Sequence, residues 1–324
     1  MALIADIGGT NARFALTDPA ADVPAMIEPR SLVNAEFASL QHAAEHYLAE
    51  VGVKPRSAAI AVASPVHGEE IRLTNRAWSF TRTELQRALG LDRLAVINDF
   101  GAVSWAIPAL QPHEYVTLHG LDDAPLRGPV SVIGPGTGLG VALLVGDEQR
   151  GWEVVETEGG HVSFAPIGDE EQMISRWLTA RFGRASTERV LCGAGLSHID
   201  GVLRSGDAGV NEADLRDPAE IVKAALEGHD VASRRALARF CAVLGSVAGD
   251  AALIHGARTV MIAGGMVPRF IPFLRSSAFR ERFLAKGRFT AYLESVTIRV
   301  IIHPHPGLLG AAVAARAAML ESDR

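Results

Sequence analysis

Cysteine is scarce in this sequence, because its 324 residues include only Cys192 and Cys241. Two cysteines form neither a disulfide framework nor a four-cysteine zinc site. Such sparse use is typical of a reducing compartment, so we expect a cytoplasmic protein. The N-terminus carries no basic segment and meets an acid at Asp6, and therefore does not resemble a signal peptide.

An excess of basic residues is also absent. The chain holds 31 Lys and Arg against 37 Asp and Glu, a formal net charge of −6, which argues against nucleic acid as a partner. Long apolar runs are missing too, since Asp250 interrupts 242–257 and Arg316 interrupts 307–320. Neither run reaches the roughly 18–20 residues of a membrane span. We therefore expect neither nucleic acid nor a membrane as a partner.

Two common nucleotide-binding signatures are missing. No G-x-x-x-x-G-K-[ST] occurs, which excludes a P-loop enzyme. No G-x-G-x-x-G opens a helix either, because the glycines at 134–140 alternate and a strand is expected after them. A dinucleotide-dependent dehydrogenase is therefore disfavoured.

The chain is long enough for about two domains, and its apolar pattern predicts an α/β protein. Short apolar runs predict strands at 2–7, 13–16, 58–63, 94–97, 130–133, 260–263 and 296–302. Helical patterns occur at 37–50, 100–110, 169–183, 187–192, 218–227, 231–255 and 307–320. The helix at 231–255 is apolar enough to be central and buried. Prolines and glycines over 111–129 indicate a linker between the domains.

One pattern repeats along the chain. Gly9-Thr10 precedes an apolar strand at 14–16, and Gly136-Thr137 precedes another at 141–143, each after a short apolar strand. The register is the same with an offset of 127 residues. Coincidence remains one explanation, and duplicated halves that open with the same phosphate-facing hairpin are the other.

Three glycine-rich turns follow apolar strands. They lie at Asp6-Ile7-Gly8-Gly9-Thr10, at Gly134 to Gly140 and at Gly264-Gly265. Glycine permits tight turns and lets backbone N–H groups approach an anion closely. Any one of these turns can simply close a hairpin, but three in one chain favour a nucleotide.

Two aspartates end predicted strands. Asp6 is placed to bind Mg²⁺ or its water shell, or else to cap a turn. Asn98 and Asp99 end a strand that runs into a helix, at the edge where α/β proteins collect ligands. A carboxylate there can accept the proton of an alcohol that attacks a γ-phosphate, or it can be a helix N-cap.

Glu158 and His161 enclose two glycines on a turn with nothing to pack. A carboxylate can accept hydrogen bonds from vicinal hydroxyls, and histidine can both donate and accept, a combination that suits a polyol. Glu188, after Ser186-Thr187 at a helix start, either supplies a second carboxylate or stabilises the helix dipole.

Together these segments resemble the bacterial glucokinase family. The resemblance rests on DIGGTNARFAL (6–16), LTNRAW (73–78), INDF (97–100), GPGTGLGVA (134–142), EGGHVSFAP (158–166), ERVLCGAGL (188–196), AGGMVPRF (263–270) and PGLLGA (306–311). The matches keep their order and span nearly the whole chain. Ser163 and Cys192 depart from the family pattern, and neither matches a sugar-contact position.

The resemblance implies the actin-like ATPase fold, a ribonuclease H-like α/β fold with an interdomain cleft. It implies a small domain of 1–110 plus 303–324 and a large domain of 111–302, and a homodimer. Sugar contacts are implied for Asn98, Asp99, Glu158, His161 and Glu188, with Asp99 as the catalytic base. ATP would be bound by Ala5, Asp6, Ile7, Gly8, Gly9, Thr10, Gly136, Thr137, Gly138, Gly264 and Gly265.

The expected reaction is transfer of the γ-phosphoryl group from Mg-ATP to O6 of glucose, which is the entry to glycolysis. Kinases for other hexoses are an alternative, as is a non-catalytic ATP-gated sugar sensor. The sequence also leaves open whether ATP or polyphosphate is the phosphoryl donor.

Overall fold

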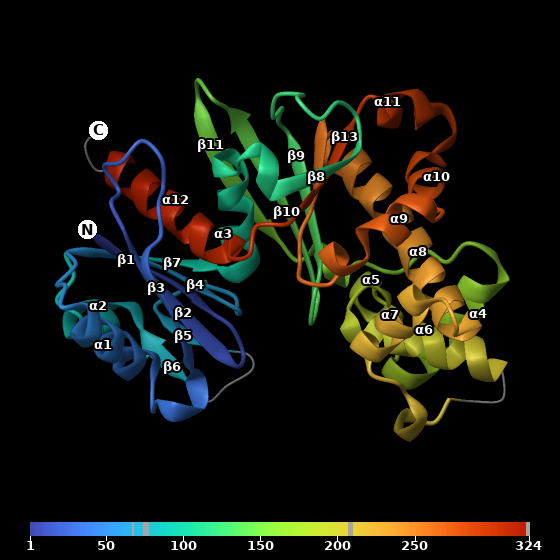
Figure 1. Ribbon diagram of the computed structural model, residues 1–324, viewed down its shortest axis with the longest axis horizontal. Coiled ribbons are helices and arrows are strands. Elements are labelled where there is room, and N and C mark those ends of the chain that lie inside the picture. Colours follow the sequence, from blue (N-terminus) through green and yellow to red (C-terminus); the bar gives the residue numbers. More distant parts are fainter. Residues whose placement is uncertain (67, 74–77, 207–209, 322–324) are drawn as a thin grey trace. The chain divides into compact units, whose positions relative to one another are not determined.

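The computed structural model describes residues 1–66, 68–73, 78–206 and 210–321, which form two compact units (Figure 1). The first unit contains residues 1–111, 152–156 and the C-terminal segment from His303, and the second contains 112–151 and 157–302. The segment 152–156 lies within the range that the sequence assigned to the large domain. The central residues of the LTNRAW motif, 74–77, lie outside the described residues.

The first unit is built on a five-stranded sheet of order β3-β2-β1-β4-β7. Its strands are β1 (Ala2–Ile7), β2 (Asn11–Thr17), β3 (Ile27–Val33), β4 (Ser57–Val62) and β7 (Arg93–Asn98), and a separate hairpin consists of β5 (Glu70–Arg72) and β6 (Ser79–Thr81). Strand β4 lies parallel to both β1 and β7, and Val62 is in register with Ile7 and with Asn98. The carboxyl ends of these three strands therefore share one edge of the sheet, the edge where α/β proteins bind ligands.

Helices cover the faces of this sheet. They are α1 (Leu40–Val51), α2 (Arg82–Ala88), α3 (Asp99–Ala106) and α12 (Pro306–Glu321), with short 3₁₀ turns η1 (Asn34–Glu36) and η2 (Ile107–Ala109). Figure 1 shows α12, from the far end of the chain, beside α3. A Cβ at Gly310 would overlap the carbonyl of Ala102, so this glycine permits the close approach of the two helices.

The second unit contributes most of a six-stranded sheet of order β11-β10-β9-β12-β13-β8, whose strand β11 includes residues 152–156 of the first unit. Its strands are β8 (Tyr115–His119), β9 (Val130–Pro135), β10 (Leu139–Asp147), β11 (Gly151–Thr157), β12 (Thr259–Ile262) and β13 (Thr297–Ile301). Its helices are α4 (Gly168–Phe182), α5 (Thr187–Val190), α6 (Gly193–Ser205), α7 (Pro218–Glu227), α8 (Val231–His255), α9 (Ile271–Ser276), α10 (Phe279–Leu284) and α11 (Thr290–Glu294). The 3₁₀ turns are η3 (Pro112–Glu114), η4 (Gly159–His161), η6 (Glu212–Asp214), η7 (Val267–Phe270) and η8 (Gly287–Phe289).

Helix α8 is the expected central helix. By length and composition it could cross a membrane, but 67% of its apolar window is buried inside the protein. Phe240, Val243 and Leu244 on this helix are fully buried in the main core of the second unit. Its apolar surface is therefore satisfied by packing, as in the core helix of a folded domain.

The two sheets repeat one topology. In the first unit β1 pairs antiparallel with β2 and parallel with β4, and in the second β9 pairs antiparallel with β10 and parallel with β12. The turn after β1 holds Gly9-Thr10, and the turn after β9 holds Gly136-Thr137. The repeat seen in the sequence thus corresponds to the same hairpin at the same place in each sheet, as expected for duplicated halves.

Some expected elements were wrong. The proposed linker at 111–129 contains β8, which pairs with β13 as the edge strand of the sheet. Its five residues are only partly buried, so the apolar signal is weak beside the surrounding prolines and glycines. The helix expected at 187–192 ends at Val190, and the longer α6 that follows was missed because Gly193, Gly195 and Gly201 interrupt its pattern.

Candidate functional site

Asn34 stabilises the turn between β1 and β2 through hydrogen bonds to its backbone. The backbone N–H of Gly8 donates to the carbonyl of Asn11 at 3.0 Å, which closes the turn. Asn34 is fully buried, its Nδ2 donates to the carbonyl of Gly8 at 2.8 Å, and its backbone N–H donates to the carbonyl of Thr10 at 2.9 Å. Asn34 was not among the site residues predicted from the sequence, because it lies 24 residues after the turn that it supports.

Asp6 lies beside this turn at the end of β1. It is directly opposite Arg13 in the β1–β2 ladder, and Nη1 of Arg13 lies 3.3 Å from its Oδ2. A Cβ at Gly307, in the first turn of α12, would lie 3.0 Å from the Asp6 carboxylate, so the glycine leaves room for it. Burial raises the pKa of Asp6, and the neighbouring Arg13 and His305 lower it. The Asp6 carboxylate is therefore partly buried and pairs with Arg13, so its role differs from that of a turn cap.

Asn98, and not Asp99, is the N-cap of α3. Its Oδ1 accepts the backbone N–H groups of Phe100 and Gly101 at 2.9 and 3.1 Å, and its Nδ2 donates to the carbonyl of Ser64 at 3.3 Å. The alternative in which Asp99 merely caps the helix is therefore wrong. The cap leaves the neighbouring carboxylate available for another task.

The carboxylate of Asp99 is partly buried at the first position of α3. Its Oδ1 accepts the backbone N–H of Phe100 at 2.8 Å. Burial raises its pKa to about 6; the hydrogen bond from the N–H of Phe100 lowers the pKa, and the negative charges of Asp6 and Glu156 add smaller upward contributions. A carboxylate with this pKa is poised to accept a proton near neutral pH.

In the second unit the turn after β9 has the same position in its sheet as the turn after β1. The backbone N–H of Gly136 donates to the carbonyl of Gly138 at 2.8 Å, and the N–H of Gly193 at the start of α6 donates to the carbonyl of Gly136 at 2.9 Å. The turn is thus closed on itself and fixed to a helix N-terminus. Exposed backbone amides near a helix N-terminus favour an anion.

Gly264 and Gly265 lie at the same sheet edge. Strand β12 is parallel to β9, with Ile262 in register with Ile133, so the two glycine turns follow neighbouring strands. Gly264 has φ +88° and a Cβ there would lie 2.9 Å from the carbonyl carbon of Pro135. Only glycine fits this conformation and this spacing.

Glu158, His161 and Glu188 converge in the second unit. Nε2 of His161 lies 3.8 Å from Oε2 of Glu158, and Nδ1 lies 3.8 Å from Oε1 of Glu188. The side chains of Glu158 and His161 are 76% and 58% exposed, whereas that of Glu188 is 29% exposed. Two carboxylates and an imidazole on an accessible surface can form a hydrogen-bonding set for several hydroxyl groups.

The glycines between Glu158 and His161 have a steric function. A Cβ at Gly159 would lie 2.9 Å from Cβ of Val141, and a Cβ at Gly160 would overlap the carbonyl of Leu139. Strand β10 therefore packs directly against η4. This packing explains why a turn with two adjacent glycines carries the two polar residues.

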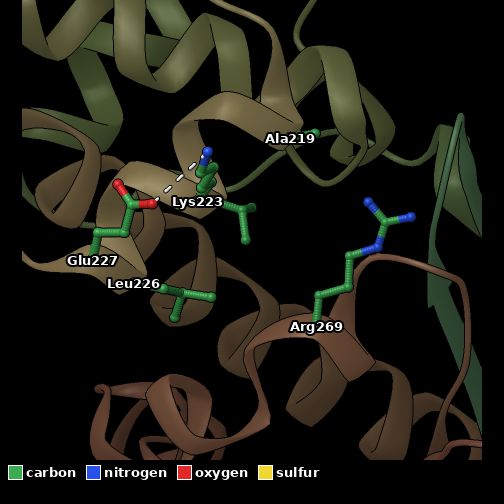
Figure 2. A pocket seen from close by; sticks show the side chains of 6 residues that line it. Ala219, Lys223, Leu226, Glu227 and Arg269 are labelled. Atoms are coloured by element: carbon green, nitrogen blue, oxygen red, sulfur yellow. Dashed lines mark ion pairs between the residues drawn. The ribbon is translucent and has the colours of Figure 1, made fainter.

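A cavity of about 410 Å³ lies between α7 and η7 of the second unit, lined by Ala219, Val222, Lys223, Leu226, Glu227 and Arg269. Figure 2 shows Arg269 extended from one side and Lys223 paired with Glu227 on the other. The start of α7 and the glycine turn both lie beside Gly193, since a Cβ at Gly193 would lie 3.6 Å from Pro218 and 3.7 Å from the carbonyl of Gly136. This cavity was not predicted from the sequence, because its two walls are 42 residues or more apart in the chain.

The predicted site residues thus form one group in each unit. In the first unit the shared edge of the sheet brings the segment Ala5–Thr10 near Asn98 and Asp99. In the second unit Oε2 of Glu188 accepts the N–H of Leu139, directly after the turn that holds Gly136, Thr137 and Gly138. Gly264 packs against the same hairpin.

Comparisons with known proteins agree with one another. The family model described as Glucokinase matches residues 3–318. A glucokinase of Xanthomonas campestris pv. campestris is 44% identical over 316 residues, 96% of this chain and 93% of its own. A glucokinase of Xylella fastidiosa is 42% identical over 322 residues, 97% of this chain and 94% of its own.

Solved structures show the same relationship. The crystal structure of a glucokinase from an Antarctic psychrotroph matches with a TM-score of 0.86 and 36% identity, covering 98% of each chain. A hexokinase of the ROK family from Thermus thermophilus matches with a TM-score of 0.66 and 16% identity over 100% of this chain and 99% of its own, which shows the fold alone. The α/β fold of the actin-like ATPases expected from the sequence is confirmed.

Proposed function

We propose that Asp99 is the catalytic base of this protein. The chain belongs to the glucokinase family and phosphorylates glucose with ATP. The observation that carries the proposal is the environment of its carboxylate. The side chain is partly buried at the carboxyl edge of the sheet, its pKa is raised to about 6, and Asn98 performs the capping in its place. A general base works best when its pKa lies near the operating pH.

The chemical step is an in-line transfer. The 6-hydroxyl of glucose gives its proton to the Asp99 carboxylate while O6 forms a bond to the γ-phosphorus of ATP. The bond from that phosphorus to the β,γ-bridging oxygen breaks, which yields ADP and glucose 6-phosphate. Because phosphoryl transfer needs little covalent catalysis, the protein contributes mainly by positioning the substrates and by donating hydrogen bonds to the charged phosphate oxygens.

Glucose is held, in this proposal, by Asn98, Asp99, Glu158, His161 and Glu188. The distances from His161 to the two carboxylates support the assignment, because an imidazole that lies 3.8 Å from each of Glu158 and Glu188 forms with them a set of hydrogen-bonding groups for neighbouring hydroxyls of a sugar ring. Nδ2 of Asn98 can donate a second hydrogen bond beyond the one that it gives to Ser64.

ATP is bound, in this proposal, through the backbone of the glycine turns. The turns are formed by Ala5, Ile7, Gly8, Gly9 and Thr10 in the first unit, and by Gly136, Thr137, Gly138, Gly264 and Gly265 in the second. Because the N–H groups of Gly8 and Gly136 close their own turns, the donors for the phosphates are the other amides of the turns and the hydroxyls of Thr10 and Thr137. The cavity beside α7 suits the nucleoside, since Arg269 offers a planar guanidinium and Val222 and Leu226 offer apolar surface.

Asp6 is the residue we assign to Mg²⁺, through the water shell of the ion. A single carboxylate suits Mg²⁺, which usually keeps several waters and takes its other ligands from substrate phosphates. The donor set fits this use, because the Asp6 carboxylate lies in β1 directly before the turn of Gly8, Gly9 and Thr10, which in this proposal holds the phosphates. When bound, the ion would neutralise charge on the phosphates.

Replacement of Asp99 tests the assignment. Asp99→Ala is expected to lower kcat by several orders of magnitude, on the scale of a lost general base, with a modest change in KM for glucose. Turnover is measured in a coupled assay with glucose and Mg-ATP. Near-normal turnover in this variant would contradict the assignment.

Two further expectations follow from the family. The alternative is a kinase for another hexose, and a panel of phosphorylation assays across hexoses compares the other hexoses with glucose as substrates. A homodimer in the cytoplasm is expected, and light scattering that finds a monomer at working concentration would overturn the dimer.

A further inference from the structure

Glu156 contacts the chain just before the proposed base, although no part of the proposed reaction uses it. Its Oε1 accepts the backbone N–H of Asn98 at 3.1 Å. Strand β7 ends at Asn98 and is the edge strand of its sheet, with β4 as its neighbour on one side. On its outer side β7 has no partner strand among the described residues. The Glu156 carboxylate thus accepts a hydrogen bond from a backbone N–H at this free edge.

The same carboxylate lies against Gly101. The three atoms nearest to a Cβ built on Gly101 all belong to Glu156, and its Cγ and Cδ would lie 3.1 Å from that Cβ. Gly101 is buried inside α3 and has no positive φ, so the helix itself does not require glycine there. Alanine is the better helix former by about 1 kcal/mol. The space above the first turn of α3 is therefore kept free for Glu156.

Three sets of hydrogen bonds consequently fix the Asn98–Asp99 segment. Ser64 accepts from the side chain of Asn98, the amides of α3 donate to Oδ1 of Asn98, and Glu156 accepts from its backbone N–H. The first two contacts fix the side chain of Asn98, whereas the contact with Glu156 fixes the peptide group one residue before Asp99. Because only Asn98 separates that peptide group from the Cα of Asp99, its orientation bears on the direction in which the Asp99 carboxylate leaves the backbone.

We propose that Glu156 is a positioning residue for Asp99, that it acts as a hydrogen-bond acceptor for the backbone N–H of Asn98, and that Gly101 is glycine to leave room for it. The proposal rests on the proposed function, because it assigns to Glu156 the orientation of that base. Glu156 contacts neither substrate in this account. Its removal therefore changes the rate of the chemical step more than the binding of glucose.

Kinetics of four single variants and one double variant test the proposal. Glu156→Ala is expected to lower kcat on the order of tenfold, with KM for glucose within about twofold, since small displacements of a catalytic group cost rate. Glu156→Gln keeps an acceptor oxygen and is expected to restore kcat to within about twofold of the original protein. Glu153→Ala, on the same strand and exposed, is the matched control and is expected to leave kcat and KM unchanged.

Gly101→Ala supplies an independent readout. The added methyl group displaces the exposed, flexible Glu156 side chain at little cost, so this variant is expected to be at least as stable as the original protein in thermal denaturation while its kcat falls to the Glu156→Ala level. In the double variant with Glu156→Ala the methyl group meets no carboxylate. Gly101→Ala is therefore expected to cause no further loss of kcat there.

The outcomes separate this proposal from the assignment of the base. If Asp99→Ala is inactive but Glu156→Ala retains the original kcat, the positioning role is wrong and the base assignment stands. Equal losses in Glu156→Gln and Glu156→Ala would also overturn it, because the charge and not the acceptor would then matter. Normal turnover in Asp99→Ala would instead remove the base assignment.

Discussion

Glu188 accepts the backbone N–H of Leu139 at 2.9 Å through Oε2, while its Oε1 lies 3.8 Å from Nδ1 of His161. One carboxylate at the start of α5 is thus fixed to the first residue of β10, directly after the glycine turn. A Cβ at Gly138 would lie 2.5 Å from Oε2 of Glu188, so the glycine of the turn is needed for this contact as well. Glu188 therefore links the residues proposed to bind the sugar to the turn proposed to bind phosphate in the second unit.

Removal of this carboxylate is expected to weaken glucose binding. Glu188→Ala should raise KM for glucose on the order of ten- to a hundredfold, the value of a charge-assisted hydrogen bond. Glu188→Gln should be intermediate, because its amide oxygen can still accept the N–H of Leu139. Steady-state kinetics with varied glucose measures the effect, and Glu153→Ala is the control. An unchanged KM in Glu188→Ala would exclude Glu188 from the sugar site.

The pH dependence of the reaction should report Asp99. Its carboxylate must be ionised to accept the proton of the sugar hydroxyl, and its pKa is about 6. We therefore expect kcat/KM for glucose to rise with pH through about pH 6 and to decline about tenfold per pH unit below it. A pH–rate profile with saturating ATP measures this limb. A rate that stays constant down to pH 4.5 would contradict it.

The same carboxylate should cost stability at neutral pH. Because the pKa of Asp99 in the folded protein is raised to about 6 from 3.8, its stabilising contribution is present below about pH 3.8 and is lost as pH rises through about 6. Asp99→Asn should therefore increase the free energy of unfolding at pH 7.5, on the order of 2 kcal/mol, and much less near pH 4. Urea unfolding at both pH values measures the difference.

A suitable control for that experiment is Asp92→Asn. Asp92 pairs with Arg56 at an exposed position, and exposed ion pairs contribute at most about 1 kcal/mol. No gain in stability is expected from this variant at either pH. Equal effects of the two substitutions would refute the explanation from burial.

Two adjacent glycines should respond differently to alanine. Gly264 has φ +88° and would place a Cβ against the backbone of Pro135, whereas a Cβ at Gly265 meets no atom of the described residues within 4 Å. Gly264→Ala is expected to lower stability by about 1–3 kcal/mol and to raise KM for ATP, while Gly265→Ala keeps the stability of the original protein. Thermal denaturation and kinetics with varied ATP provide the comparison. Equal stability of the two variants would be inconsistent with this geometry.

Arg269 should affect the nucleotide alone. If its guanidinium lines the nucleoside cavity, Arg269→Ala raises KM for ATP several-fold, about 1 kcal/mol for a stacked cation, and leaves KM for glucose unchanged. Arg150→Ala, an exposed arginine in the same unit, is the control. A parallel rise in both KM values would indicate damage to the fold in place of a lost nucleotide contact.

Much of the architecture could be predicted from local patterns. Strands such as β1, β4 and β9 are buried on both faces and appear as continuous apolar runs, so their positions were predicted to within one or two residues. The strand β8 was missed because an edge strand buries little and leaves a weak pattern. Helix α6 was missed because its glycines are required by neighbours, as at Gly195, where a Cβ would overlap the carbonyl of Val190.

The sequence by itself determined the family, the two glycine hairpins with their repeated topology, and the polar residues that follow the strands. These features depend on residue type and short spacing, which the chain carries before it folds. Tertiary structure alone decided that Asn98 is the cap beside Asp99, that Asn34 supports the first turn and that Glu188 is fixed to Leu139. It also decided that Glu156 takes the N–H of Asn98 over the space left by Gly101. Each of these contacts joins residues or assigns roles that no local pattern distinguishes, because hydrogen bonds and burial depend on which atoms the fold brings together.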